Sequence, residues 1–163
     1  PLDNITKPFY RITHAEAVKK LQGMGSKIKD NDDLGAEDET KLTQEFDNPI
    51  FVTHYPAEIK SFYMKRDANG SKAECADLLA PEGYGEIIGG SQREDDYDEL
   101  VKRVKEHKLP MDEFAWYLDL RKYGSVPHGG FGFGLERVVA WVCGVQHVRE
   151  TIPFPRTIHR IRP

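Results

Sequence analysis

The sequence has few cysteines, no long apolar run and no excess of positive charge. Its two cysteines, Cys75 and Cys143, lack the CxxC spacing of a metal site. With no basic leader followed by an apolar stretch, we expect two ordinary thiols in a reducing cytoplasm. No segment approaches the roughly 18 apolar residues of a membrane span, so we expect no membrane partner. A net charge of -4 argues against a module whose main task is gripping nucleic acid.

The rest of the composition is typical of a folded domain. Hydrophobic residues make up 39% of the 163 positions and charged residues 31%, a balance found in globular rather than disordered proteins. This length suffices for one domain with a core of its own. The first residues, Pro1-Leu2-Asp3-Asn4, are not a natural initiation sequence, so we expect the chain to be a piece of a longer protein.

Local sequence patterns predict an α+β fold. Residues 1–14 indicate an extended lead-in, and Thr13 and Glu16 form the capping box of a helix that ends at Gly23. We predict further helices over 36–46, 95–108, 112–123 and 135–142, and strands over 50–53, 62–64, 73–79, 84–90 and 129–134. Because the connections between strands are too short for crossover helices, the strands should form an antiparallel sheet flanked by helices.

A glycine-rich strand carries the sharpest chemical pattern. In Gly129-Gly130-Phe131-Gly132-Phe133-Gly134, glycines at alternate positions leave one face of the strand bare, so that a flat ligand such as a nucleobase could lie against the backbone. Arg137 follows in the first turn of a helix, where the helix dipole and a guanidinium both favour phosphate. The spacing is not the GxGxxG dinucleotide fingerprint. From spacing alone, a Gly/Phe hairpin packed on a core helix is an equally good interpretation.

A second segment, Gly85-Glu86-Ile87-Ile88-Gly89-Gly90-Ser91-Gln92-Arg93, places a carboxylate and a guanidinium on one strand. Glu86 and Arg93 are seven residues apart, an odd separation that would put them on opposite faces of a regular strand. The double glycine could supply a bulge that brings both to one site. Without further information, Glu86 and Asp77 are more simply explained as ordinary charges at a sheet edge.

Residues 129–144 resemble motif 3 of the class II aminoacyl-tRNA synthetases, on the strength of Gly-Phe-Gly-Phe-Gly-Leu-Glu-Arg followed by an apolar helix. The resemblance implies that the glycine strand flanks the adenine of ATP. It also implies that Arg137 is catalytic and contacts the γ-phosphate. The ATP site would then include Gly132, Gly134, Leu135, Glu136 and Arg137.

The segment from Gly85 to Arg93 resembles the substrate-binding strand of the aspartyl and asparaginyl subgroup of these synthetases. The resemblance implies that Glu86 and Asp77 bind Mg²⁺ at the ATP phosphates, a role suited to hard carboxylate oxygens. It also implies that Arg93 reads the side-chain carbonyl of the substrate, with Gly89 in the amino-acid pocket. Glycine rather than serine at position 89, and Glu94 after the arginine, fit the asparaginyl branch better.

This resemblance covers nearly the whole chain and is weakest over residues 23–47. It implies that residues 1–163 are the C-terminal part of a catalytic domain, with motifs 1 and 2 and the anticodon-binding domain upstream. The full enzyme would use ATP and Mg²⁺ to activate asparagine, transfer it to tRNA(Asn) and act as a homodimer. We expect the fragment alone to be nearly inactive and, without a partner strand, to expose an apolar sheet edge. An aspartyl enzyme, an anticodon-less paralogue that makes asparagine, and a non-catalytic synthetase-derived module remain alternatives.

Four other side chains have ordinary interpretations. Lys60 lies near the amino-acid pocket in relatives, but a solvated lysine on the sheet is the simpler prediction. His128 could touch a ligand or only shape the loop before the glycine strand. Trp116 and Trp141 fall on predicted helix faces and are predicted to lie in the core.

Overall fold

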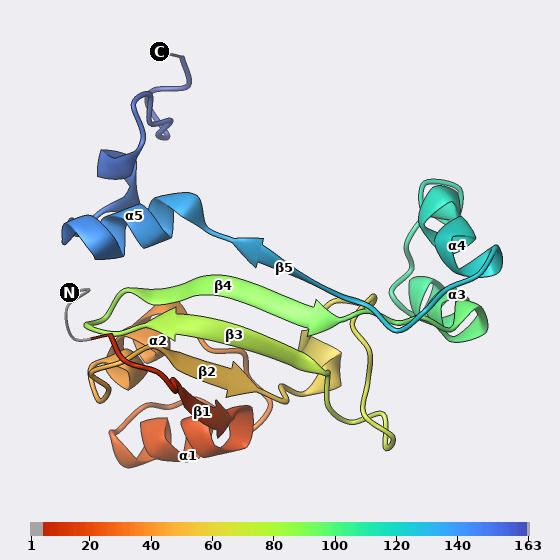
Figure 1. Cartoon of the computed structure of the whole chain (residues 1–163), viewed down its shortest axis with the longest axis horizontal. Coiled ribbons are helices and arrows are strands. Elements are labelled where there is room, and N and C mark those ends of the chain that lie inside the picture. The colour runs from red at the N-terminus through yellow and green to blue at the C-terminus, as the bar shows by residue number, and fades with distance from the viewer. Residues whose placement is uncertain (1–4, 163) are drawn as a thin grey trace.

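A five-stranded sheet organises the chain, with helices on both of its faces (Figure 1). The computed structural model describes residues 5–162. The strands, in order across the sheet, are β1 (Tyr10–Thr13), β2 (Ile50–Thr53), β3 (Cys75–Ala80), β4 (Gly85–Gln92) and β5 (Gly129–Phe133). The helices are α1 (His14–Gly23), α2 (Ala36–Thr43), α3 (Tyr97–Glu106), α4 (Ala115–Lys122) and α5 (Leu135–Cys143), with 3₁₀ turns η2 (Ala57–Ile59) and η3 (Val148–Thr151). The α+β prediction is confirmed.

The antiparallel prediction holds for every neighbouring pair of strands except the first. β1 and β2 run parallel, with Tyr10 opposite Ile50, so the sheet is mixed. Helices α1 and α2 lie between these strands in the chain and supply the crossover that parallel pairing requires. The predicted lead-in over residues 1–14 therefore ends in a strand, while residues 1–4 lie outside the described part of the chain.

The predicted strand over residues 62–64 is wrong. This segment forms a turn, and Met64 makes one isolated bridge to Arg93. Its aromatic side chains, Phe62 and Tyr63, pack against a small separate core that α3 and α4 build from Leu100, Val104 and Leu118. The apolar run at 62–64 thus serves this core rather than the sheet.

Each face of the main sheet has its own core. On one face, α1 and α2 pack against alternate strand residues such as Val52 and Leu79. Helix α1 begins at the predicted capping box, in which the Thr13 hydroxyl accepts from the Glu16 amide. On the opposite face, α5 inserts Trp141 beside Leu78. The site-bearing strands β3 and β4 are therefore held from both sides.

Several large aromatic side chains lie on the surface of the structure. Trp116 is 66% exposed, so its prediction as a core residue is wrong, whereas Trp141 is buried as predicted. Within the described residues 5–162, strand β5 pairs only with β4 and forms an edge of the sheet, with Phe131 and Phe133 exposed. This matches the expected apolar edge. Across residues 5–162, no helix has the length and apolar character needed to cross a membrane.

Candidate functional site

A β-bulge in β4 brings the predicted site residues onto one face of the sheet. Leu78 of β3 pairs with Ile88, but the next residue, Leu79, pairs with Glu86, so Ile87 is the extra residue. Glu86 and Gly89 then share the face of the sheet that also carries Asp77. The predicted bulge therefore exists. It lies at Ile87 and not at the double glycine, because Ile87 can bury its side chain in the opposite core.

The two carboxylates converge above Gly89. A side chain at position 89 would place its Cβ 2.8 Å from Glu86 Oε1 and 3.3 Å from Asp77 Oδ1. Both oxygens thus occupy the space that glycine leaves free. Burial raises the pKa of Glu86, the nearby Asp77 carboxylate raises it further, and Arg137 opposes both. Such crowding of like charges is favourable for binding a cation between them.

Lys60 is a partner of this pair rather than a solvated lysine. Its ammonium lies 3.0 Å from Asp77 Oδ2 and 3.7 Å from the centre of the Tyr55 ring. Burial is the largest influence and lowers the pKa of Lys60, but the charge and hydrogen bond of Asp77 together with the charge of Asp33 outweigh it, so the pKa is raised. The ammonium is therefore charged and neutralises Asp77, while the Glu86 carboxylate makes no hydrogen bond within the described residues. The prediction for Lys60 is wrong because η2 folds it back over the sheet.

Arg93 lies in the same cavity as the carboxylates. The cavity has a volume of about 560 Å³, and its lining includes Asp77, Glu86, Gly89, Arg93 and Gly132. The guanidinium lies 4.6 Å from the centre of the Tyr63 ring and donates to the Ser91 hydroxyl. A side chain at Gly130 would come within 3.0 Å of that guanidinium. The glycines of β5 therefore leave room for an arginine as well as for a ligand.

Arg137, on α5, does not line this cavity but lies against β4 beside it, where it lines a second pocket. Its guanidinium donates to the Glu86 carbonyl oxygen at 2.7 Å, which fixes it beside the carboxylate-bearing strand. Gly134, Leu135 and Glu136, predicted for the same nucleotide site, do not line the cavity either. Gly134 donates its amide to the Ile87 carbonyl, and Leu135 and Glu136 are exposed on the first turn of α5.

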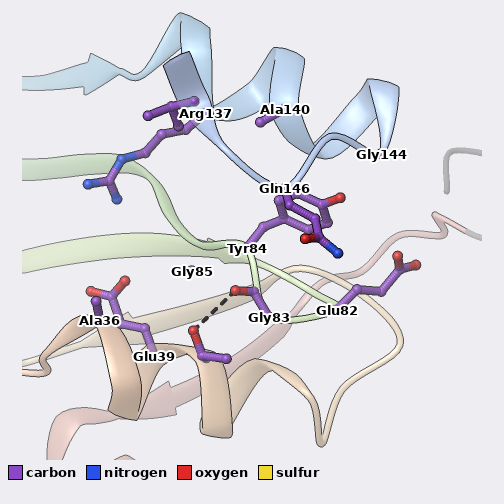
Figure 2. A pocket seen from close by; sticks show the side chains of 12 residues that line it. Ala36, Glu39, Glu82, Gly83, Tyr84, Gly85, Arg137, Ala140, Gly144 and Gln146 are labelled. Atoms are coloured by element: carbon purple, nitrogen blue, oxygen red, sulfur yellow. Dashed lines mark hydrogen bonds between the residues drawn. The ribbon is translucent and has the colours of Figure 1, made fainter. Parts of the chain in front are cut away.

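Glu39 supports the site from a neighbouring pocket, a role that the sequence analysis missed. Its carboxylate accepts the backbone N–H of Glu86 at 3.0 Å, so it clamps the start of the bulged strand. Figure 2 shows Glu39 from α2 and Arg137 from α5 approaching one pocket, of about 480 Å³, from opposite sides. The Thr40 hydroxyl of the same helix, α2, donates to the Gly83 carbonyl at 3.2 Å. The acidic start of α2 predicted a helix but not its contact with β4, which is 47 residues away in sequence.

His128 shapes the loop before β5, which is one of the two roles predicted for it. Its Nδ1 contacts the Val126 carbonyl at 2.8 Å, and its own carbonyl accepts the Arg93 amide at 2.9 Å. The imidazole therefore shapes the loop before β5. It does not line the cavity that contains Arg93.

Comparison with known proteins identifies the class of protein that carries this sheet and cavity. A family model described as "tRNA synthetases class II (D, K and N)" matches residues 2–158. The chain belongs to this family.

Among individual relatives, the asparagine–tRNA ligases of Koribacter versatilis and Pyrococcus abyssi are 56% and 58% identical, each over 99% of this chain and 38% of the relative. Among solved structures, asparaginyl-tRNA synthetase from Pyrococcus horikoshii complexed with asparaginyl-adenylate matches with a TM-score of 0.93 and 56% identity, over 96% of this chain and 36% of that one. Aspartyl tRNA synthetase from Entamoeba histolytica matches with a TM-score of 0.88 but 32% identity, over 98% and 34%. The chain spans about 38% of the length of the curated relatives that it matches.

Proposed function

We propose that this chain is the C-terminal part of the catalytic domain of an asparagine–tRNA ligase. The observation that carries the proposal is the convergence of Asp77, Glu86, Gly89 and Arg93 with the bare β5 strand in one cavity. This cavity offers an anionic end, a cationic end and a wall that includes the bare backbone of Gly132. These are the features needed to bind a metal–nucleotide complex beside a small polar amino acid. The high identity to asparagine–tRNA ligases over the whole chain supports the same assignment.

ATP is proposed to lie with its adenine along Gly132 of β5 and its phosphates near Glu86. Arg137, held by the Glu86 carbonyl at 2.7 Å, has further N–H donors to bind the terminal phosphate. Exposure of this guanidinium leaves it accessible to a ligand. Gly134, Leu135 and Glu136 would then support the nucleotide site from the strand-to-helix turn rather than from the cavity wall.

Asp77 and Glu86 form a suitable pair for Mg²⁺. Within residues 5–162 no three His, Cys, Asp or Glu side chains are grouped to bind a metal on their own. Mg²⁺ typically takes one or two carboxylates and completes its shell with phosphate oxygens and water, so the pair fits. When bound, the ion would neutralise phosphate charge. Because Lys60 already neutralises Asp77, Glu86 is the stronger of the two ligands.

Arg93 is proposed to read the amino-acid side chain. Asparagine presents a carbonyl oxygen that a guanidinium can donate to, and Gly89 keeps the floor of the pocket free. The carboxylate of asparagine would attack the α-phosphorus of ATP, releasing pyrophosphate and forming the asparaginyl adenylate. The acyl group would then pass to tRNA(Asn), with AMP as the leaving group. The residues of this chain supply position and charge neutralisation and no covalent nucleophile.

We further propose that the full-length protein acts as a cytoplasmic homodimer. Both thiols, Cys75 and Cys143, are free, as suits a reducing compartment. The exposed β5 edge with Phe131 and Phe133 supports the proposal that other chain segments complete the sheet in the full-length protein.

The test is ATP–pyrophosphate exchange by the full-length protein with asparagine or aspartate. We expect exchange with asparagine, little with aspartate, and very little from the isolated 163-residue chain. Arg137→Gln should abolish most of the exchange, whereas Arg149→Gln, on the exposed turn η3, should not. Preference for aspartate would favour the aspartyl alternative, and conversion of aspartate to asparagine would favour the paralogue. Strong exchange by the isolated chain would overturn the incomplete-site interpretation, and no exchange by the full-length protein would favour a non-catalytic module.

A further inference from the structure

A group of buried charges lies directly behind Arg93, outside the cavity. Glu94, Arg103 and Arg121 are only 2%, 3% and 5% exposed, and none of them lines the cavity. Burying ionised groups is unfavourable unless their contacts are well formed, and such groups often specify one arrangement rather than add stability. Their contacts therefore show which part of the molecule they hold in place.

Glu94 fixes the backbone that follows Arg93. Its carboxylate lies 2.7 Å from Arg103 and 3.0 Å from Lys65. The same carboxylate accepts the N–H groups of Asp95 and Asp96, each at 3.1 Å. Two cations and two amides thus bind one side chain, and they immobilise the turn that leads out of β4.

The segment that carries the Tyr63 ring belongs to the same network. The Glu94 amide donates to the Tyr63 carbonyl at 2.8 Å, and the Arg103 guanidinium donates to the Met64 carbonyl at 2.6 Å. The Tyr63 ring in turn lies against the guanidinium of Arg93. Glu94 therefore fixes both the start of the Arg93 side chain and the surface on which its guanidinium rests.

Arg121 secures the same site from α4. Its Nε donates to the Glu94 carbonyl at 2.9 Å, and its terminal nitrogen lies 3.3 Å from His128 Nε2. His128 accepts the Arg93 amide through its carbonyl. Arg93 follows the last residue of β4, where one bridge to Met64 replaces the regular ladder. The network supplies the order that the sheet no longer provides at this position.

We propose that Glu94 and Arg121 are positioning residues that set where the Arg93 guanidinium meets the side chain of the substrate amino acid. The inference rests on the proposed function, because it takes Arg93 as the group that reads that side chain. The network touches Arg93 and its supports but neither Glu86 nor Arg137, so it acts on amino-acid binding and not on nucleotide binding.

The experiment measures asparagine-dependent ATP–pyrophosphate exchange in the full-length protein. Glu94→Gln keeps the shape of the side chain but turns an amide toward Lys65 and Arg103. Because small misplacements of a binding group can change rates about a hundredfold, we expect the KM for asparagine to rise at least about tenfold. The KM for ATP should stay unchanged, and discrimination against aspartate should weaken.

Glu99→Gln is the matched control. The Glu99 carboxylate also contacts Arg103, at 3.4 Å, but unlike that of Glu94 it accepts no hydrogen bond from the backbone of residues 93–96. This variant should leave the KM for asparagine unaltered. Arg121→Lys keeps the charge but removes the Nε donor to the Glu94 carbonyl, so it should also raise the KM for asparagine. It provides a second test of the network in case Glu94→Gln folds poorly.

The outcomes separate the two proposals. Folded variants with an unaltered KM for asparagine, or with KM values for asparagine and ATP that rise together, would overturn the positioning role. In that case the network would serve stability alone, visible as a lower melting temperature. If the wild-type protein shows no asparagine-dependent exchange, the proposed function itself fails.

Discussion

Replacing Gly85 by alanine should destabilise the chain by about 3 kcal/mol through two separable effects. Gly85 has φ +72°, where an L-residue costs roughly 1–2 kcal/mol. The added Cβ would also lie 2.6 Å from Glu39 Oε2, the atom that accepts the Glu86 amide. Glu39 must then move away, and losing a hydrogen bond to a charged group costs about 1.5–3 kcal/mol. For a chain of this size, the melting temperature should fall by roughly 6–12 °C.

Urea unfolding of wild type and variants measures both effects. Gly70→Ala is the control, because Gly70 has φ +71° but no atom within 4 Å of the added Cβ. It should lose only the backbone contribution, about 1 kcal/mol. In a Glu39→Ala background, Gly85→Ala should cost no more than Gly70→Ala. If Gly85→Ala and Gly70→Ala are equally destabilising in the wild-type background, Glu39 does not clamp β4 and the reasoning is refuted.

Three further predictions concern the site and the core. Gly89→Ala should weaken Mg²⁺-dependent ATP binding by about tenfold, because its Cβ displaces both carboxylates. Gly23→Ala adds its Cβ in open space and should leave ATP binding unchanged. Calorimetric titration of the full-length protein with ATP and Mg²⁺ compares the two variants. Since the pKa of Glu86 is raised and only the ionised form binds a cation, Mg²⁺ affinity should increase as pH rises through that pKa, and a flat profile would contradict this. In chemical unfolding, Trp141→Ala should lower the free energy of unfolding by about 3 kcal/mol, because this side chain is buried. Trp116→Ala should lower it by less than about 0.5 kcal/mol, because Trp116 is exposed. Equal losses would show that the two environments are misassigned.

Patterns within short segments were sufficient to predict most elements. The capping box at Thr13, the alternating glycines of β5 and the apolar stripes of the helices each act over a few residues, so local sequence determines them. The existence of a bulge between Glu86 and Arg93 also followed from counting residues. Its position did not, because Ile87 bulges in response to a core built by other elements.

The errors arose where distant segments decide the outcome. Trp116 lies on a helix whose inner face is used by other residues, and a helix pattern alone does not identify the covered face. Lys60 is buried because η2 brings it to Asp77, 17 residues away in sequence. Glu39 reaches the Glu86 amide of β4 for the same reason, across an even longer separation. Side-chain contacts of this kind depend on tertiary packing rather than on local preference.

The extra residue at position 87 makes the site sensitive to whether insertions are odd or even in length. If one residue were lost or gained between Glu86 and Arg93, the two side chains would point to opposite faces of the sheet. The carboxylate and the guanidinium would then no longer share one cavity. A two-residue change would preserve their common side while altering their spacing. Sequence variation in this stretch should therefore come in pairs, and a viable single-residue deletion would have to be accompanied by straightening of the strand.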